Sequence, residues 1–585
     1  MKNLFLLLTL ILIPVACPAN QCDTVWVSEF DRLENGDATG AVRQAIEAAR
    51  TRQAKVLAFD SKRYDLWPEN ATQREWFISN TSSEEECPSK VKTIGILIEE
   101  FNNLTIDGND ASLVFHGKMI TLAISNSKDI TVKNLSIDFE RPTMSEMTIV
   151  ESTPDYTDVI FHPDSRFEID SVGHISLVGE GWRSNIFHCI EYDPTTERRD
   201  YSDVWNRLEA SKARQISPNK VRFETSGLEE KTGYILTVRD IIRDQVGVFI
   251  NESENIEMSD VKTHYMHGLG IVSQNSRNLS MLRVTCAPRK DSGRLIASSA
   301  DFMHFSGCAG IISVADCYFS GAHDDCINVH GTNLRIVEKT DSTCAVVRFM
   351  HPQSYGFRVF EAGDTVSLVR ASTMNRFATR VIKSVTRLSD REIKLEFSTP
   401  LPDGILLNSD CVENLSQTPQ VEIRRCFFSN TNTRGTLVTT PRKVVIADNT
   451  YYKTGMSAIL IEADASSWFE SGPVCDVTIE NNRFVDCGYL GGPHKAVIAL
   501  NPSVQTESDT VSTGSEPKTY QPAHENVVIR NNTFETTGNP AVFALSTSPI
   551  TIENNIIRPY RSSTIASNRN NSDQFSTNSP FILEN

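Results

Sequence analysis

The stretch VTIENNRF at residues 477–484 recurs twice further along the chain, as VVIRNNTF at residues 527–534 and as ITIENNII at residues 550–557. Each copy is a short run of alternating apolar residues followed by two asparagines. Alternating runs predict β-strands, and their recurrence along a chain is typical of stacked β-coils. Asparagine side chains at equivalent turns are expected to stack in a ladder from coil to coil. The repeats therefore predict a right-handed parallel β-helix.

Similar alternating runs extend this β-helix towards the N-terminus, at residues 104–108, 120–124, 130–134 and 421–430. Twice the short period breaks and longer strands replace it, which predicts inserted β-barrel-like modules at residues 141–240 and 333–415. The predicted fold class is all-β, a right-handed parallel β-helix with two inserted β-barrel-like modules. The remaining segments are β-helix coils at 20–140, 241–332 and 416–558, and a polar C-terminal tail at 559–585.

The N-terminal region carries a predicted signal peptide and a predicted cap. Lys2 and the apolar run at residues 4–15 predict a signal peptide over residues 1–19, so we expect a periplasmic or secreted protein. Cleavage before Cys17 would instead give a lipid-anchored protein, and this alternative stays open. No later segment has the length and hydropathy of a transmembrane helix. The stretch GAVRQAIEAAR at residues 40–50 has helical spacing and is expected to cover the open end of the coils.

Composition narrows the classes of function. The chain has 585 residues, 39% of them hydrophobic and 22% charged, so it is expected to fold rather than stay disordered. Its net charge of −17 argues against nucleic acid and anionic membrane surfaces as partners. The thirteen cysteines form no Cys-x-x-Cys spacing and no cluster with histidines, so they do not predict a metal site.

Three aspartates in the stretch 299–331 are the candidate catalytic groups. The sequence DFMHF, which begins at Asp301, matches DCINV, which begins at Asp325, and the same comparison one coil earlier aligns Gly270 with Asp301. Stacked coils would put Asp325 roughly 4.8 Å from Asp301, with Asp324 beside it. Carboxylates that close raise one another's pKa, and a protonated acid beside ionised carboxylates can cleave a glycosidic bond. Calcium binding or turn capping by the same aspartates is the alternative.

Five further residues are candidates for substrate binding. Two histidines flank the aspartates and would bind sugar hydroxyls or stack inside the coil. The other three follow the second predicted module. Arg434 is expected near the position of Asp324 one coil on, and Glu462 and Trp468 could form a sugar-stacking wall. The five residues are His304, His330, Arg434, Glu462 and Trp468.

The aspartate motif resembles two families of inverting glycoside hydrolases that are built on β-helices. Ser299-Ala300-Asp301 and His323-Asp324-Asp325 are similar to the Asn-Thr-Asp and Gln-Asp-Asp of polygalacturonases, but Val329-His330-Gly331 comes too early for that family and no Arg-x-Lys clamp follows. The run HDDCINVHGT at residues 323–332 more closely resembles glycoside hydrolase family 110, exported bacterial α-1,3-galactosidases that act on blood group B type glycans. The layout of a β-helix with two barrels is also similar.

The resemblance implies a hydrolase of carbohydrate metabolism, a glycosidase that releases terminal α-galactose from an oligosaccharide or glycoconjugate with inversion. It also implies that the enzyme uses no metal and no other cofactor. In such an enzyme one carboxylic acid protonates the leaving oxygen and a carboxylate activates water. Asp301 and Asp325 share a register and would act jointly as the base. Asp324 is offset by one residue and would be the acid, although the roles could be exchanged. Neighbours in an ideal strand face opposite sides, so Asp324 and Asp325 need a bend or bulge to share one site.

Three other functions fit the sequence. A pectin-type hydrolase would use the same aspartates, a calcium-dependent polysaccharide lyase would bind its metal there, and a glycan-binding solenoid would have no turnover. The sequence also leaves open a homodimer and a requirement for a fucose branch on the substrate.

Overall fold

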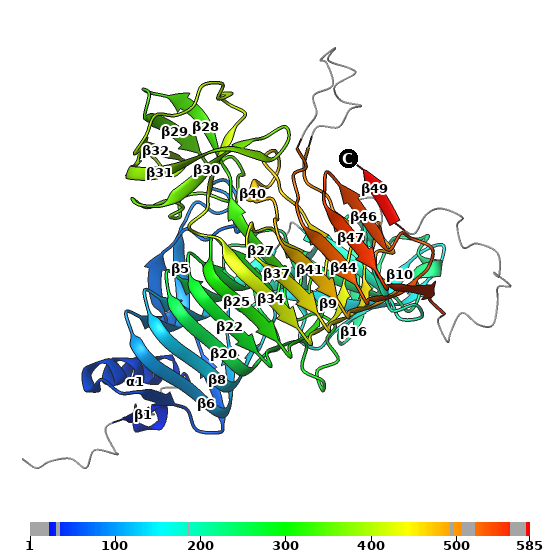
Figure 1. Ribbon diagram of the computed structural model, residues 1–585. Helices are drawn as coiled ribbons and strands as arrows, with labels where there is room; N and C mark the ends of the chain where they lie inside the picture. Colours follow the sequence, from blue (N-terminus) through cyan, green and yellow to red (C-terminus); the bar gives the residue numbers. More distant parts are fainter. Residues whose placement is uncertain are drawn as a thin grey trace, which may run out of the picture.

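A computed structural model describes residues 23–30, 36–184, 187–491, 496–504, 521–561 and 581–584. Its main body is a parallel β-helix from which two other β-structures project (Figure 1). The predicted signal peptide and Cys17 lie outside the described residues. Within the described part of the chain, no helix has the length and apolar character needed to cross a membrane.

Two long sheets form the walls of the β-helix. In the first sheet, most coils contribute two short strands separated by a bend, and successive coils pair in parallel. Its strands are β1 (Thr24–Trp26), β2 (Val56–Ala58), β3 (Arg63–Leu66), β6 (Asn102–Phe115), β8 (Lys128–Phe139), β20 (Glu254–Thr263), β22 (Arg277–Leu282), β23 (Thr285–Cys286), β25 (Ala309–Ala315), β26 (Tyr318–Ser320), β34 (Pro419–Arg424), β35 (Phe427–Thr431), β37 (Val444–Ala447), β38 (Thr450–Thr454), β41 (Val477–Glu480), β42 (Arg483–Val485), β44 (Val527–Arg530), β45 (Thr533–Thr536), β47 (Ile550–Glu553) and β48 (Ile556–Pro559).

The second sheet takes one strand from each coil and carries the candidate site. Its strands pair in parallel except β4 and β40, which join β5 and β27 in antiparallel fashion. They are β4 (Thr72–Glu75), β5 (Val91–Glu99), β7 (Ile120–Ser125), β19 (Val246–Asn251), β21 (Leu269–Gln274), β24 (Met303–Ser306), β27 (Ile327–Thr332), β36 (Thr436–Val438), β39 (Ile459–Ile461), β40 (Glu470–Ser471), β43 (Ile498–Leu500), β46 (Val542–Leu545) and β49 (Phe581–Glu584).

The predicted asparagine ladder is confirmed at the bend of the first sheet. Nδ2 of Asn482 donates to Oδ1 of Asn532 at 3.1 Å, and Nδ2 of Asn532 donates to Oδ1 of Asn555 at 3.0 Å. The other asparagine of each pair has the left-handed backbone that turns the chain, with φ of 57° at Asn481 and 55° at Asn531. One residue of each pair therefore makes the turn, and the other satisfies buried polar groups between coils.

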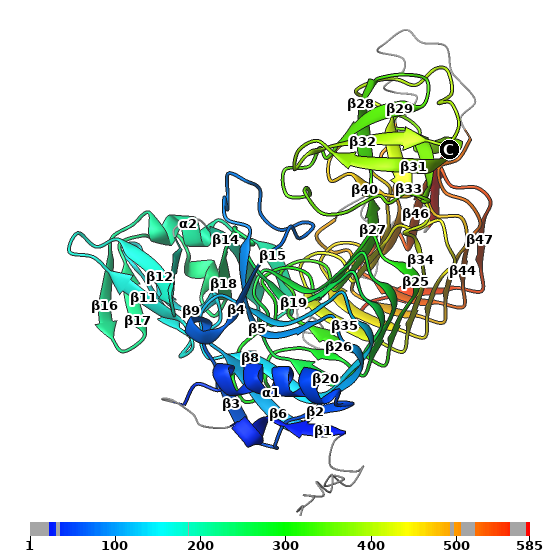
Figure 2. The ribbon, with the colours of Figure 1, turned by 90° about the vertical axis from the view of Figure 1, so that its left-hand side faces the viewer.

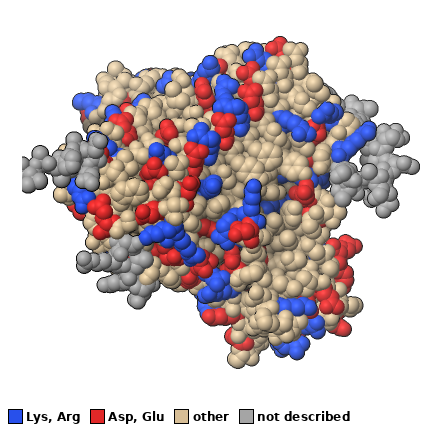
Figure 3. Space-filling model, turned by 90° about the horizontal axis from the view of Figure 1, so that it is seen from below, with Lys and Arg blue, Asp and Glu red and all other residues tan. Residues whose placement is uncertain are grey.

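Inside the coils, apolar side chains from successive turns stack on one another. Phe428, Tyr451, Phe484 and Phe534 form a continuous stack with ring centroids 4.5 to 5.1 Å apart. They belong to one core that runs the length of the β-helix. On the face of the molecule seen in Figure 3, acidic and basic side chains are interspersed.

The helix predicted at residues 40–50 is α1 (Thr39–Arg52), which lies at the N-terminal end of the β-helix (Figure 1). Its buried Ala41, Val42, Ala45 and Ala49 are part of the same core as the first coils. The helix therefore covers apolar surface that no further coil would bury.

The first insert contains a seven-stranded antiparallel sheet and a three-stranded sheet, and it leaves the β-helix after β8 and returns before β19. The larger sheet has the order β15 (Arg198–Tyr201), β14 (Phe187–Asp193), β18 (Ile235–Asp240), β9 (Met144–Ser152), β10 (Thr157–Phe161), β17 (Lys220–Phe223) and β16 (Ala213–Ser217). The smaller sheet consists of β11 (Arg166–Ile169), β12 (Ile175–Gly179) and β13 (Trp182–Ser184), and a short helix α2 (Val204–Glu209) completes the insert.

The second insert is a closed barrel with its own apolar core, and it joins the coils between β27 and β34. Figure 2 shows the two inserts as separate lobes that project from the coils. The strands of the barrel are β28 (Leu334–Lys339), β29 (Cys344–Arg348), β32 (Glu392–Phe397), β31 (Asn375–Arg387), β30 (Thr365–Arg370) and β33 (Cys411–Asn414).

Two expectations need correction. The segment 559–585 is not entirely a tail, because β49 (Phe581–Glu584) pairs in parallel with β46 and adds a strand to the second sheet. The apolar run Phe581-Ile582-Leu583 was obscured by the polar residues before it. The expected alignment of Gly270 with Asp301 is also wrong, because Ile271 pairs with Met303, one position further along the chain than that alignment requires.

Candidate active site

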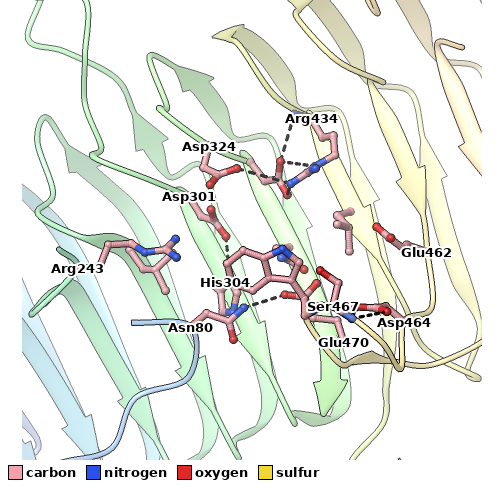
Figure 4. A pocket seen from close by; sticks show the side chains of 15 residues that line it. Asn80, Arg243, Asp301, His304, Asp324, Arg434, Glu462, Asp464, Ser467 and Glu470 are labelled. Carbon is pink, nitrogen blue, oxygen red and sulfur yellow. Dashed lines mark hydrogen bonds and ion pairs between the residues drawn. The ribbon is translucent and has the colours of Figure 1, made fainter. Parts of the chain in front are cut away.

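The three aspartates line a pocket on the second sheet with a volume of about 110 Å³ (Figure 4). Of the five residues predicted to bind substrate, four also line this pocket: His304, Arg434, Glu462 and Trp468. His330 lies behind His304. Figure 4 shows Asp301 and Asp324 on one side of the pocket and Glu462, Asp464 and Glu470 on another.

The predicted register of the aspartates is confirmed. Met303 of β24 pairs with Ile327 of β27, which is the alignment expected from the match between DFMHF and DCINV. The backbone N–H of Phe302 donates to the carbonyl oxygen of Asp325 at 3.0 Å, so Asp301 and Asp325 lie on adjacent coils. Asp324 and Asp325 precede β27 and lie in a bend rather than in the strand. The bend removes the strand alternation that would send their side chains to opposite faces.

Asp325 is a buried carboxylate held by one arginine. Arg434 donates Nε and Nη2 to its two oxygens at 2.7 and 2.9 Å, and the backbone N–H of Arg434 adds a third contact at 3.2 Å. Burial raises the pKa of Asp325 to about 7, and the charges of Asp324 and Asp301 raise it too, while Arg434 opposes them. The result is a carboxyl group that exchanges a proton near neutral pH.

Asp301 is also buried, but its partner is a histidine. Oδ2 of Asp301 lies 2.8 Å from Nδ1 of His304. Burial raises the pKa of Asp301 well above its ordinary value, and the neighbouring charge of Asp324 is the next largest cause. Asp301 therefore favours its neutral form more strongly than an exposed aspartate does.

Asp324 is the most exposed of the three carboxyl groups. Its side chain is 28% exposed, against 5% for Asp301 and 1% for Asp325. Its Oδ1 lies 3.6 Å from Nη2 of Arg434, and its backbone carbonyl accepts a hydrogen bond from the hydroxyl of Thr431. The side chain is thus free to meet a substrate atom in the pocket.

The two histidines form a chain behind Asp301. Nε2 of His304 lies 2.9 Å from Nε2 of His330, and Nδ1 of His330 lies 2.7 Å from the carbonyl oxygen of Gly331. His330 is 2% exposed, and its Nε2 also lies 3.6 Å from Oε1 of Glu470 in the wall of the pocket. His323, which precedes the aspartate pair, is buried as well, and its Nε2 lies 2.7 Å from Oγ1 of Thr237 in the first insert.

Arg434 occupies a different register position from the one expected. Ile327 pairs with Thr436, so Arg434 stacks on Asp325 rather than on Asp324. The prediction was off by one residue because the barrel between β27 and β34 interrupts the repeat and no constant shift spans it.

The opposite wall of the pocket is a short loop before β40. The carboxylate of Asp464 accepts backbone N–H bonds from Ser466, Ser467, Trp468 and Phe469 and so fixes the loop. Trp468 is 40% exposed, and its indole stacks on the ring of His351 in the second insert at 4.0 Å. The wall therefore presents an aromatic surface to the pocket, as a sugar-binding site commonly does.

Glu462 and Glu470 add two carboxyl groups to this wall. Burial raises the pKa of Glu462 to about 7, and Arg434 opposes the shift. Oε1 of Glu470 accepts a hydrogen bond from Nδ2 of Asn80 at 2.8 Å. Among the described residues, no group of three or more His, Cys, Asp or Glu side chains has the geometry to hold a metal ion.

Sequence reasoning missed six polar residues of the pocket, and the apolar Leu269 and Leu437. Two come from segments far from the aspartates: Asn80 precedes the first coils, and Arg243 follows the first insert and donates to Gln353 of the barrel at 2.6 Å. No repeat position or motif marks them. The six are Asn80, Arg243, Asn328, Asp464, Ser467 and Glu470.

Three family models match the chain. GLAA-B beta-barrel domain I matches residues 145–232, GLAA-B beta-barrel domain II matches residues 345–412, and a right handed beta helix region matches residues 403–582. The fold is therefore a right-handed β-helix with two inserted barrel domains, as predicted.

Named relatives match nearly the whole chain. Alpha-1,3-galactosidase A of Bacteroides fragilis is 53% identical over 95% of this chain and 91% of its own length. Alpha-1,3-galactosidase B of Bacteroides thetaiotaomicron is 32% identical over 89% of this chain and 83% of its own. Among solved structures, the A-module of a mannuronan C-5 epimerase of Azotobacter vinelandii is similar at 9% identity and a TM-score of 0.35, over 92% of this chain and 96% of that one. With the identity and coverage of the galactosidases, the chain belongs to the family of the alpha-1,3-galactosidases A and B.

Proposed function

We propose that the protein is an exo-acting, inverting α-1,3-galactosidase of glycoside hydrolase family 110 that removes terminal galactose from blood group B type glycans. The observation that carries the proposal is the cluster of Asp301, Asp324 and Asp325 in one pocket, in a chain whose relatives bear that activity in their names. Three carboxyl groups of differing exposure can divide the acid and base roles of glycoside hydrolysis.

We assign the acid role to Asp324 and the base role to Asp325. Asp324 is the most exposed carboxyl group, so it can reach the oxygen of the leaving sugar and donate its proton. Asp325 exchanges its proton near pH 7, and Arg434 stabilises its ionised form, which suits a group that takes a proton from water. In an inverting reaction that water attacks the anomeric carbon from the face opposite the leaving oxygen and gives β-galactose.

The walls of the pocket support cleavage at a chain end. Trp468 offers an apolar face to one side of a sugar ring, while Glu462 and Glu470 offer acceptors to its hydroxyl groups. Asn80 and Arg243, from outside the repeating coils, add further walls. A pocket closed by such walls accommodates a terminal residue, whereas an endo-acting enzyme needs a groove open at both ends.

Proton NMR of the purified protein acting on Gal-α-1,3-Gal tests the proposal. We expect the β-anomer of galactose to appear first, before mutarotation produces the α-anomer. The matched control is Asp324→Asn, which should release no galactose while retaining the fold. α-Galactose as the first product would refute inversion, and no release from this substrate or from its fucosylated form would refute the galactosidase assignment. Uronic acid released from pectin would favour the polygalacturonase alternative.

A further inference from the structure

The hydrogen bonds behind Asp301 form a chain whose direction can be worked out from one end. The carbonyl oxygen of Gly331 can only accept, so Nδ1 of His330, at 2.7 Å, carries a proton. In a neutral imidazole the other nitrogen is then an acceptor. Nε2 of His330 therefore accepts from Nε2 of His304 at 2.9 Å.

The same reasoning continues through His304. A neutral His304 that donates from Nε2 has an acceptor at Nδ1, which lies 2.8 Å from Oδ2 of Asp301. An ionised carboxylate has no proton to donate, so two acceptors would face each other. A neutral carboxylic acid completes the chain, because its hydroxyl donates to Nδ1.

From this geometry we infer that Asp301 is a neutral carboxylic acid at neutral pH, held in that form by His304 and His330, and that it acts as a hydrogen-bond donor and not as a base. His304 and His330 are then positioning residues for the galactosidase site. The inference rests on the proposed function only for its catalytic consequence, because the protonation state itself can be measured without turnover. It replaces the expectation that Asp301 and Asp325 share the role of base.

A charged alternative would keep every hydrogen bond but bury more charge. Either histidine could hold a second proton and leave Asp301 ionised, so that a cation and an anion lie in the interior. His304 is 1% exposed, and burial lowers its pKa to about 3, with the ring of His330 lowering it further. Glu470, whose Oε1 lies 3.6 Å from Nε2 of His330, favours a proton on that nitrogen. Burial disfavours both charges of such a pair, and on this ground we take the neutral arrangement as the more stable.

The surrounding charges are mixed. Asp324 and Glu470 raise the pKa of Asp301, whereas Arg243 and Arg434 lower it. The pairing of Arg434 with Asp325 at 2.7 Å leaves Asp325 as the carboxylate best stabilised in ionised form. One neutral and one ionised carboxyl group on adjacent coils avoid the repulsion that two bases there would have. Asp301 would orient the attacking water, and Asp325 alone would take its proton.

Infrared difference spectroscopy tests the protonation state directly. The spectrum of Asp301→Asn is subtracted from that of the unchanged protein at pH 7. We expect the difference to contain the carbonyl stretch of a protonated carboxyl group, which shifts in heavy water. If the substitution instead removes the two bands of an ionised carboxylate from the spectrum, the inference is overturned. The asparagine amide can donate to His304 as a neutral acid does, so this variant should keep its fold.

The role of the histidine pair is tested with two substitutions at His330. His330→Gln supplies an amide oxygen that accepts the hydrogen bond from His304, so Asp301 should stay protonated. The band of the protonated carboxyl group should therefore persist in this variant. It is measured by subtracting the spectrum of the double variant that carries both His330→Gln and Asp301→Asn. His330→Leu removes the acceptor, so His304 can turn its proton towards Asp301. We expect the pKa of Asp301 in this variant to fall by about one unit, which is the worth of one ordinary hydrogen bond.

The same two variants have different effects on turnover. With His330→Leu, the limb of the kcat/KM profile that reports deprotonation of Asp301 should move to lower pH by about one unit, while the limb set by the acid, Asp324, should stay in place. His330→Gln should leave both limbs in place. Circular dichroism reports whether each variant is folded. An unchanged band and pH profile in folded His330→Leu would overturn the role of the pair. Absence of any galactosidase activity would refute the proposed function and leave the infrared result standing.

Discussion

Replacing Arg434 with glutamine should move the acid limb of the pH–activity profile to higher pH. Arg434 makes two charge-assisted bonds to Asp325, at 2.7 and 2.9 Å, and bonds of this kind contribute about 1.5–3 kcal/mol. One pKa unit corresponds to about 1.4 kcal/mol, so loss of the arginine should raise the pKa of Asp325 from about 7 by roughly one to two units. At pH 7 the ionised fraction of the base, and with it kcat/KM, should fall about 5- to 50-fold.

The assay is initial-rate hydrolysis of Gal-α-1,3-Gal over a range of pH. Arg425→Gln is the matched control, because Arg425 on the same coil makes the same two-bond pair with Asp316, at 2.7 and 2.9 Å, but outside the pocket. Its profile should coincide with that of the unchanged protein. An acid limb that stays in place in Arg434→Gln, with activity lowered equally at every pH, would show that Arg434 does not tune the base.

Three further predictions follow from the pocket and the coils. Asp324→Asn should bind galactobiose, as measured by calorimetry, with no turnover. Burial raises the pKa of Glu462 to about 7, so the folded protein keeps a proton that the unfolded chain releases above about pH 4.5, and stability falls as the pH rises between these two values. Compared with the unchanged protein, Glu462→Gln should therefore have a free energy of unfolding that is higher at pH 8 than at pH 4 by up to about 3 kcal/mol, as measured by chemical denaturation. Asn482→Ala leaves the hydrogen-bond partners of a buried ladder residue unsatisfied. The substitution should lower the free energy of unfolding by about 2–4 kcal/mol, as measured by the same method.

The fold could be predicted because a few neighbouring residues determine the structure of each coil. The alternating run at residues 477–484 gives a strand, Asn481 gives a left-handed turn, and Asn482 gives a contact to the next coil. Each of these features is a property of a few neighbouring residues, and its recurrence identifies the stacking direction. The two inserts interrupt the period without altering it, so they too were visible as breaks.

Register was predictable only where no extra residues intervene. The alignment of Asp301 with Asp325 was right because the chain between them is a single coil of ordinary length. The preceding coil has a longer connection before β24, and Ile271 pairs one residue further on than expected. Across the barrel, the error of one residue moved Arg434 from its true partner, Asp325, to its neighbour. Loop lengths carry no periodic signal that would correct such errors.

The protonation state of the candidate catalytic groups could not be predicted from the sequence for a different reason. His304 and His330 were visible as residues flanking the aspartates, but a histidine in a coil can face the pocket or the interior. Only the geometry shows that His330 is turned away from the pocket and bonded to Gly331, and that its direction of bonding is passed through His304 to Asp301.

The chemistry and the shape of the site come from different parts of the chain. The carboxyl groups and Arg434 all stand at one edge of the second sheet, where regular stacking brings successive coils together. Regular stacking alone would leave this edge as an open groove, because coils of equal size form a flat surface with no side walls. Closure comes from irregular segments: Asn80 bonded to Glu470, Arg243 bonded to the barrel, and Trp468 stacked on His351. Two of these three contacts involve the barrel, so the second insert helps to turn a groove into a closed pocket.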